Sequence, residues 1–218
     1  IRISIWFIAV FALTFNSVSI VIHLAQRRTL KPYDILVVSL CCSDFMFGVY
    51  LGIIASTDVY FRDKFVGKDL LWRACLTCKF AAALSQFSII YSALILSLLT
   101  FSRFMVVKYP FNSKFKQMHF VQYLCILLAF VTSLLIFLSM LWFLIYEENI
   151  YISNSLCLLH DIHGNSSALK FQTLLVILTL LGSLCLIFII YPLLIHEVNK
   201  SSSALSETLF KRKKTTST

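Results

Sequence analysis

The residue best suited to do chemistry in this 218-residue sequence is Asp44, a carboxylate in the middle of a long apolar stretch. An ionisable group at that depth of a membrane is costly and marks a functional site by default. Three polar residues of two other apolar stretches share its layer if the stretches form a bundle: Asn16, Ser92 and Ser97. This set predicts a cation or proton site that changes with conformation. The alternative is a hydrogen-bonded polar cluster that only fixes helix packing.

Two further polar residues lie near the ends of apolar stretches, Arg103 in the third stretch and Tyr191 in the fifth. Each has an ordinary explanation. An arginine at a helix end usually extends its charged head to the membrane interface, and a tyrosine there is usually an anchor. By themselves they indicate membrane anchoring more than a switch.

The seven cysteines divide into two groups. Four lie inside apolar runs, where a free thiol behaves as a small hydrophobic group: Cys41, Cys42, Cys125 and Cys185. The other three, Cys75, Cys78 and Cys157, lie in loops or at helix ends, where a disulfide forms if that face is extracellular. Cys75 and Cys78 are rivals for a bond to Cys157, because they lie only three residues apart.

Catalysis has little support in this sequence. His160 and His163 could form half of a metal site, but no further ligands are placed near them, and a solvated pair is the better interpretation. The sequence has no HExxH, GxSxG or phosphate-binding-loop motif. No second carboxylate lies deep in the apolar stretches to pair with Asp44. We expect no enzyme, no catalytic residue, and no cofactor except a cation at Asp44.

The elements that position these residues are long apolar helices. Hydrophobic residues make up 59% of the sequence and charged residues 13%, about half of the roughly 25% charge of soluble domains. Apolar runs of about 20 residues are typical of membrane-spanning helices. We predict an all-α, multi-pass transmembrane bundle packed around its third span. The spans are expected at residues 3–24, 33–57, 78–107, 120–146 and 169–195, with a basic tail at 196–218.

The distribution of lysine and arginine orients the spans. The segments 25–32, 103–119 and 196–218 hold three, four and five of these residues, so that 12 of the 19 lie on one side. The positive-inside rule places that side in the cytoplasm and the N-terminus outside the cell.

A second signal agrees with this orientation. Cys78, Cys157 and the glycosylation sequon at Asn165 all fall outside, where disulfides form and glycans are added. The excess positive charge lies on the cytoplasmic side, so we expect no nucleic-acid partner for the net charge of +9. The basic tail is suited to anionic membrane lipid instead.

A set of motifs, taken in chain order, resembles those of the rhodopsin-like (class A) G-protein-coupled receptors. Within them it resembles the leucine-rich-repeat hormone receptors, and most closely the relaxin receptors. IRISIWF is similar to the start of that group's membrane domain, and SLCCSDFMFGVYL is similar to its second helix, with Asp44 as the buried aspartate. Trp72 followed by Cys78 resembles the first outer loop, and Arg103 with the YPF that follows resembles the inner end of the third helix. Tyr191 falls at the fifth-helix tyrosine, so the resemblance covers essentially the whole chain.

The resemblance implies a role for each residue inside the membrane. Asn16, Asp44 and Ser92 would line the sodium pocket that helps to hold such receptors inactive. Arg103 would face a heterotrimeric G protein in the active state, and Tyr191 would support it.

The resemblance also implies the arrangement outside the membrane. Cys78 and Cys157 would form the outer-loop disulfide, and Trp72 would pack at the outer surface. A peptide or protein hormone would be captured chiefly by a large leucine-rich ectodomain that is not in this chain. The receptor would reside in the plasma membrane.

The chain departs from the family pattern in residues and in extent. Ser102 stands where the family has an acid that pairs with the arginine, Phe130 where it has a tryptophan, and Ile90 where this branch has a glutamate. The expected spans correspond to the first five of seven helices. This leaves three origins: a fragment of a full receptor, a truncated non-signalling product that pairs with an intact receptor, or a decayed copy. The rival class is an unrelated five-span transporter or structural membrane protein. Transporters usually carry two related halves, and no inverted repeat is seen here.

Overall fold

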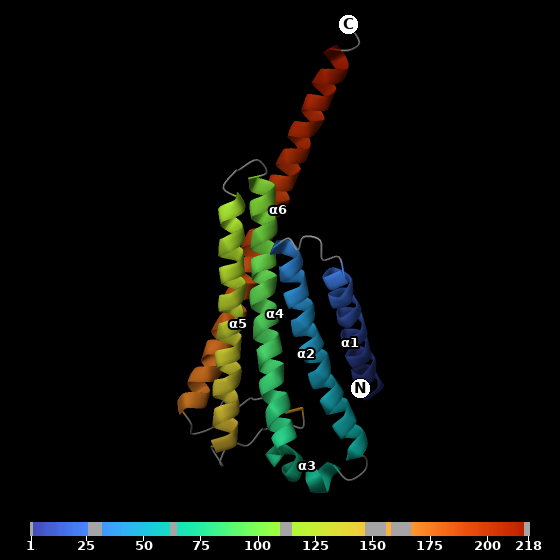
Figure 1. Ribbon diagram of the computed structural model, residues 1–218, viewed down its shortest axis with the longest axis vertical. Coiled ribbons are helices and arrows are strands. Elements are labelled where there is room, and N and C mark those ends of the chain that lie inside the picture. Colours follow the sequence, from blue (N-terminus) through green and yellow to red (C-terminus); the bar gives the residue numbers. More distant parts are fainter. Residues whose placement is uncertain are drawn as a thin grey trace.

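The computed structural model describes residues 2–25, 32–61, 65–109, 115–146, 156–157 and 167–215. All regular structure among these residues is α-helical (Figure 1). The helices are α1 (Arg2–Ala25), α2 (Pro32–Tyr60), α3 (Phe65–Ala74), α4 (Leu76–Lys108), α5 (Phe115–Tyr146) and α6 (Ser167–Thr215). The prediction of an all-α bundle is confirmed.

Five of the described helices are long and apolar enough to cross a membrane. The membrane-length segments are Ile3–Ala25, Tyr33–Tyr60, Leu76–Lys108, Phe120–Tyr146 and Lys170–Ser203. A helix suits this environment because each backbone N–H and C=O must find its partner within the segment. Short polar side chains are satisfied in the same way, as when Ser17 donates to the carbonyl oxygen of Leu13 at 2.6 Å.

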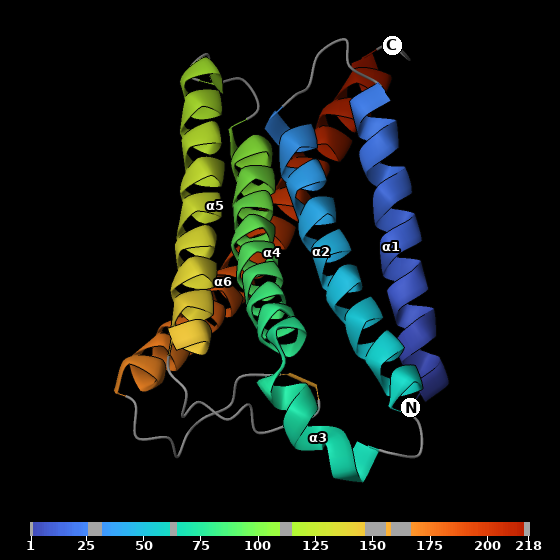
Figure 2. The same cartoon turned by 60° about the horizontal axis from the view of Figure 1, so that its bottom comes forward.

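Helix α4 is the centre of the bundle. It packs against α2, α5 and α6 and also meets α3. Figures 1 and 2 show it between α2 and α5, with α6 crossing behind it. Small residues are buried along α4: Ala81, Ala82, Ala83, Ser85 and Ser88. Small side chains let neighbouring helix backbones approach closely, which explains how one helix can serve three long partners.

Helix α1 packs against α2. The two helices pack closely at Gly48, where an added Cβ would lie 3.1 Å from the side chain of Leu13 and 3.2 Å from the Cβ of Ala12. The missing side chain of Gly48 therefore sets the separation of these two helices.

Two elements differ from the sequence-based expectation. Helix α6 continues through Pro192 and on to Thr215, whereas we expected the span to end near residue 195. A proline removes one backbone donor, and the turns on either side keep the helical hydrogen bonds that carry α6 onward. The segment after α2 also contains α3, a ten-residue helix that was not predicted. It is too short and too polar to give a membrane-length signal.

Candidate functional site

Asp44 lies in a hydrogen-bonded cluster that joins α2 to α4. The Ser92 hydroxyl donates to Asp44 Oδ1 at 2.9 Å, and Ser92 Oγ lies 2.5 Å from Ser43 Oγ. The Ser43 hydroxyl also donates to the carbonyl oxygen of Ser88 at 2.9 Å. Ser43 and Ser88 are buried. The Ser92 hydroxyl of α4 thus holds the carboxylate, and Ser43 of α2 contacts Ser92 in turn.

The cluster has more contacts than protons. Ser43 and Ser92 each carry one hydroxyl proton, while three contacts link Asp44, Ser92, Ser43 and the Ser88 carbonyl. When Ser92 donates to Asp44, the single hydroxyl proton of Ser43 is donated either to Ser92 Oγ or to the carbonyl oxygen of Ser88. The network therefore has two arrangements of hydrogen bonds at the same helix positions.

A cavity of about 540 Å³ adjoins the cluster. Its polar wall is Asp44, Ser88 and Ser92, and α6 contributes Ser183 opposite them. Its other lining residues are apolar. Space next to a carboxylate and several oxygen atoms suits a small hard cation, which prefers oxygen ligands.

The structure does not bring the other two predicted polar residues into this cluster. Asn16 Nδ2 donates to the carbonyl oxygen of Ala12 one turn back in α1, at 2.8 Å, and Asn16 does not line the cavity. Ser97 donates to its own helix at Ala93 and to the carbonyl oxygen of Ser183 on α6, at 2.9 and 3.4 Å. Ser97 therefore belongs to the contact between α4 and α6.

Arg103, near the end of α4, contacts α2. Its Nη2 donates to the phenol oxygen of Tyr33 at 2.7 Å, and its guanidinium carbon lies 5.6 Å from the centre of the Tyr33 ring. Ser102 beside it is buried and accepts a hydrogen bond from Gln122 of α5 at 2.8 Å. Tyr191 on α6 is 58% exposed and makes no hydrogen bond to Arg103 in the described part of the chain.

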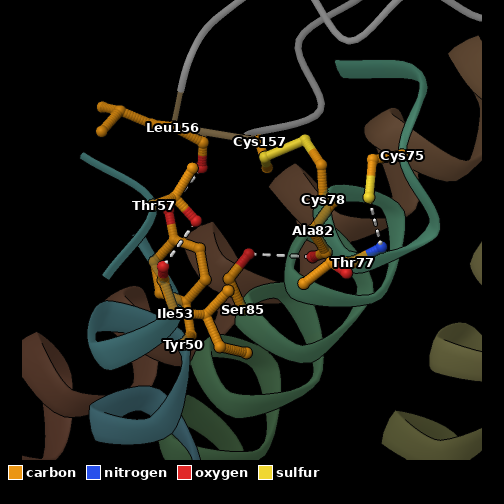
Figure 3. The surroundings of a disulfide bond; sticks show 10 residues. All are labelled: Tyr50, Ile53, Thr57, Cys75, Thr77, Cys78, Ala82, Ser85, Leu156 and Cys157. Atoms are coloured by element: carbon orange, nitrogen blue, oxygen red, sulfur yellow. Dashed lines mark hydrogen bonds between the residues drawn. A yellow bond between two sulfur atoms is a disulfide. The ribbon is translucent and has the colours of Figure 1, made fainter. Parts of the chain in front are cut away.

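At the opposite end of α4 the structure contains the disulfide Cys78–Cys157, with a Cα–Cα distance of 5.4 Å (Figure 3). Both cysteines are fully buried, and Trp72 is buried in the same apolar cluster. The Tyr50 hydroxyl on α2 donates to the carbonyl oxygen of Leu156 at 2.8 Å. Residues 156–157 are thus tied to both α2 and α4.

Cys75, the rival of Cys78, is a free thiol. It caps the start of α4, where its sulfur accepts a hydrogen bond from the backbone N–H of Thr77 at 3.4 Å. Hydrogen bonding from Thr77, which outweighs the opposing effect of burial, lowers the pKa of the Cys75 thiol. The structure therefore separates the two cysteines: Cys78 forms the disulfide and Cys75 forms the cap.

Sequence reasoning missed several partners: Ser43, Tyr33, Gln122 and Tyr50. Each reaches its partner from a different helix or loop, and no spacing within the chain signals such a contact. Only Ser43 had a signal in the sequence, because a serine next to an intramembrane acid can join the same hydrogen-bond network. The glycosylation sequon at Asn165 and the pair His160 and His163 lie outside the described residues.

The described helices form a bundle of membrane-length helices around one central helix. That helix holds a disulfide at one end, a carboxylate cluster along its length and an arginine near the other end. This is the architecture of a multi-pass membrane receptor. The sequence pattern of the family described as 7 transmembrane receptor (rhodopsin family) matches residues 15–218. The chain belongs to this family.

Individual relatives agree. The chain is 31% identical over 209 residues to G-protein coupled receptor GRL101 of Lymnaea stagnalis. The aligned region covers 94% of this chain and 18% of that protein. It is 24% identical over 217 residues to relaxin receptor 1 of Mus musculus, and the aligned region covers 94% of this chain and 27% of that receptor. It is 26% identical over 177 residues to the follicle-stimulating hormone receptor of Felis catus, and the aligned region covers 81% of this chain and 25% of that receptor. These relatives support the leucine-rich-repeat hormone receptor group. The chain spans about a fifth to a quarter of their length.

Proposed function

We propose that this chain carries membrane helices of a plasma-membrane G-protein-coupled receptor for a peptide or protein hormone, relaxin-like or related. The observation that carries the proposal is the network of Asp44, Ser92 and Ser43, which couples α2 to α4 and has two hydrogen-bonding arrangements. A receptor switches between two states, so it needs an element whose arrangement differs between them. Names such as relaxin receptor 1 belong to the relatives, and they motivate the hormone class proposed here.

Hormone would be captured by a leucine-rich ectodomain and its binding relayed to the membrane helices. The end that carries the Cys78–Cys157 disulfide would face outside, because disulfides form and persist in oxidising compartments. The Arg103 end would then face the cytoplasm and a heterotrimeric G protein. The positively charged segments at that end would contact anionic lipid.

The cavity beside Asp44 would hold a sodium ion in the inactive state. Its wall supplies one carboxylate and the hydroxyl groups of Ser88 and Ser92, which are the oxygen ligands that a hard cation prefers. Asn16 supplies none, since it does not line the cavity. The site would therefore be built from α2 and α4, with Ser183 of α6 on the opposite wall.

Arg103 would be the contact to the G protein. In the structure its guanidinium is held by the phenol of Tyr33. The acid that pairs with this arginine in the family pattern is absent, because Ser102 stands at its position. A hydrogen bond to a neutral group is weaker than one to a carboxylate. Release of Arg103 toward a partner would then cost little, and Tyr191 would support the arginine once it has moved.

The experiment is hormone-stimulated nucleotide exchange on G proteins, measured in membranes from cells that express the complete gene product. Arg103→Ala is expected to reduce the response at least tenfold at equal surface expression, because the charged contact to the G protein is lost. Lys170→Ala, which removes an exposed positive charge near the opposite end of α6, is the control and is expected to respond normally. An unchanged response in Arg103→Ala would refute the assigned role.

A further inference from the structure

Gln172 of α6 is a buried amide with one end unsatisfied. It is 7% exposed, and its Nε2 donates to the carbonyl oxygen of Ile136 at 3.2 Å and contacts Met140 Sδ at 3.3 Å, both on α5. Its Oε1 is buried and has no hydrogen-bond partner among the described residues. A buried acceptor without a donor is destabilising.

The orientation of this amide follows from its neighbours. If the amide were turned over, Oε1 would face the carbonyl oxygen of Ile136, and two acceptors cannot bond to each other. The nitrogen therefore belongs on the α5 side, and the oxygen is the atom left without a partner.

The same residues border a cavity of about 280 Å³ between α4, α5 and α6. Two amides and one hydroxyl contribute to its lining, from Gln86, Gln172 and Thr173, on an otherwise apolar wall that includes Ile136 and Met140. No charged side chain lines it. A cavity without a carboxylate or a cation discriminates against charged ligands, because their desolvation would not be compensated.

We propose that this cavity is a binding site for a neutral, mainly apolar molecule that carries one hydroxyl group, and that the hydroxyl donates to Gln172 Oε1. The oxygen is covered in the structure, and the terminal torsion of glutamine is broad enough to turn it toward an entering donor. The volume is near the lower end for ligand pockets, about 300 Å³. The ligand is therefore a small alcohol or the hydroxyl end of a larger molecule such as a membrane sterol.

The cavity at Gln172 is separate from the site of the proposed function. The cavity shares no residue with the one beside Asp44. The site would exist whether or not the chain couples to a G protein, so the test uses binding and not signalling.

The experiment compares each alcohol with its own methyl ether, which keeps the shape and loses the donor. One pair is 4-tert-butylcyclohexanol and its methyl ether, and the other is cholesterol and its methyl ether. Binding to the full chain in phosphatidylcholine nanodiscs is measured by the shift of the thermal unfolding midpoint as ligand is titrated. In one pair at least, the alcohol is expected to bind about tenfold more tightly than the ether, as the gain of a buried hydrogen bond implies.

The two pairs distinguish the source of the hydroxyl. Preference for the small alcohol alone identifies a soluble ligand, whereas preference for the sterol alone identifies a bilayer lipid. Equal binding of alcohol and ether in both pairs, or no binding by any probe, would overturn the proposal and leave hydration as the only role of the cavity.

A variant locates the effect. Gln172→Met has a similar length and lacks the oxygen, so the difference between alcohol and ether is expected to disappear. Thr179→Val is the control, because Thr179 lies on the same helix outside the cavity and bonds only to Leu175 within α6. Persistence of the difference in Gln172→Met would assign the binding elsewhere. If that variant does not fold, the comparison of alcohol with ether on the unaltered chain still decides.

Discussion

At the scale of single residues, the partners of Asp44 and Arg103 set the properties of this protein. Asp44 is bound by Ser92 from α4, and Ser43 next to Asp44 turns back to the same helix. Arg103 is bound by Tyr33, while Ser102 bonds to Gln122 on the other side of α4. The neutral pair of Ser102 and Gln122 fixes α4 to α5 without using charge, which leaves the charge of Arg103 available for an outside partner.

The free thiol of Cys75 gives a prediction about pH. Hydrogen bonding from Thr77 lowers the pKa of this thiol below its ordinary value of 9.0. Because the thiolate is the reactive form, alkylation of Cys75 by a charged maleimide should reach its half-maximal rate at a lower pH in the folded chain than in the unfolded chain. Mass spectrometry of the Cys75 peptide over a pH series measures this.

Thr77→Val is the matched variant, since it removes the side-chain hydrogen bond from Thr77, which is the largest cause of the lowered pKa, and keeps the shape and the backbone N–H. It is expected to move the midpoint of the pH profile upward, toward that of the unfolded chain. A profile that is identical in the folded chain, the unfolded chain and Thr77→Val would show that hydrogen bonding from Thr77 does not influence the thiol.

At the scale of the elements, α4 determines how the other helices are placed. Its small residues at Ala81–Ala83 allow close packing near the disulfide. Further along, aromatic rings fill the contact with α5: Phe130 meets Phe87 and Tyr91 edge to face, with ring centres 6.2 and 5.8 Å apart. A phenylalanine at position 130 thus supports the contact where the family has a larger tryptophan.

The disulfide should contribute strongly to the stability of this arrangement, because it closes a loop between residues 79 apart in sequence. The double variant Cys78→Ser/Cys157→Ser is expected to lose about 4.5 kcal/mol of unfolding free energy by the loop-entropy estimate. Thermal unfolding in detergent micelles should show a clear fall of the midpoint, accompanied by lower delivery to the cell surface.

Cys75→Ser is the control for this experiment. Serine is a good helix cap, and Cys75 forms no disulfide, so this variant should unfold within about 0.5 kcal/mol of the unaltered chain. A loss in Cys75→Ser that equals the loss in the double variant would contradict the assignment of the stabilising bond.

At the scale of the whole molecule, three sites are spaced along one central helix. At a rise of 1.5 Å per residue, Ser92 lies about 21 Å along α4 from Cys78, and Arg103 lies about 16 Å further. The disulfide, the carboxylate cluster and the arginine therefore occupy one end, the middle and the other end of a membrane-length helix. A movement of α4 relative to α2 would affect all three, because α2 contributes Tyr50, Asp44 and Tyr33 to these layers in turn.

Sodium binding at Asp44 should appear as a property of the whole fold. A ligand that binds only the folded state raises its stability by RT ln(1 + [L]/Kd), about 1.4 kcal/mol at tenfold excess over Kd. Replacement of choline chloride by sodium chloride at constant ionic strength is expected to raise the unfolding midpoint by a few degrees. Asp44→Asn should abolish this difference.

Glu197→Gln makes the same chemical change on α6 at a distance from the cavity, and it should retain the full response to sodium. Loss of the sodium effect in both variants would indicate a general effect of charge. An absent effect in the unaltered chain would remove sodium from the proposed mechanism while leaving the hydrogen-bonded cluster in place.

The sequence by itself determined the five membrane-length helices, because the length and apolarity of a run depend only on local composition. It also singled out Asp44 and Arg103, since a charge in an apolar run is visible without a fold. The tertiary structure decided which residues meet them. An apolar helix is much the same on all sides, so its rotation about its own axis is set by packing against its neighbours, such as the contact at Gly48. That rotation brings Ser43 and Tyr33 to their partners and directs the Asn16 amide nitrogen to its own helix. It also leaves the oxygen of Gln172 without a donor among the residues that the structure describes.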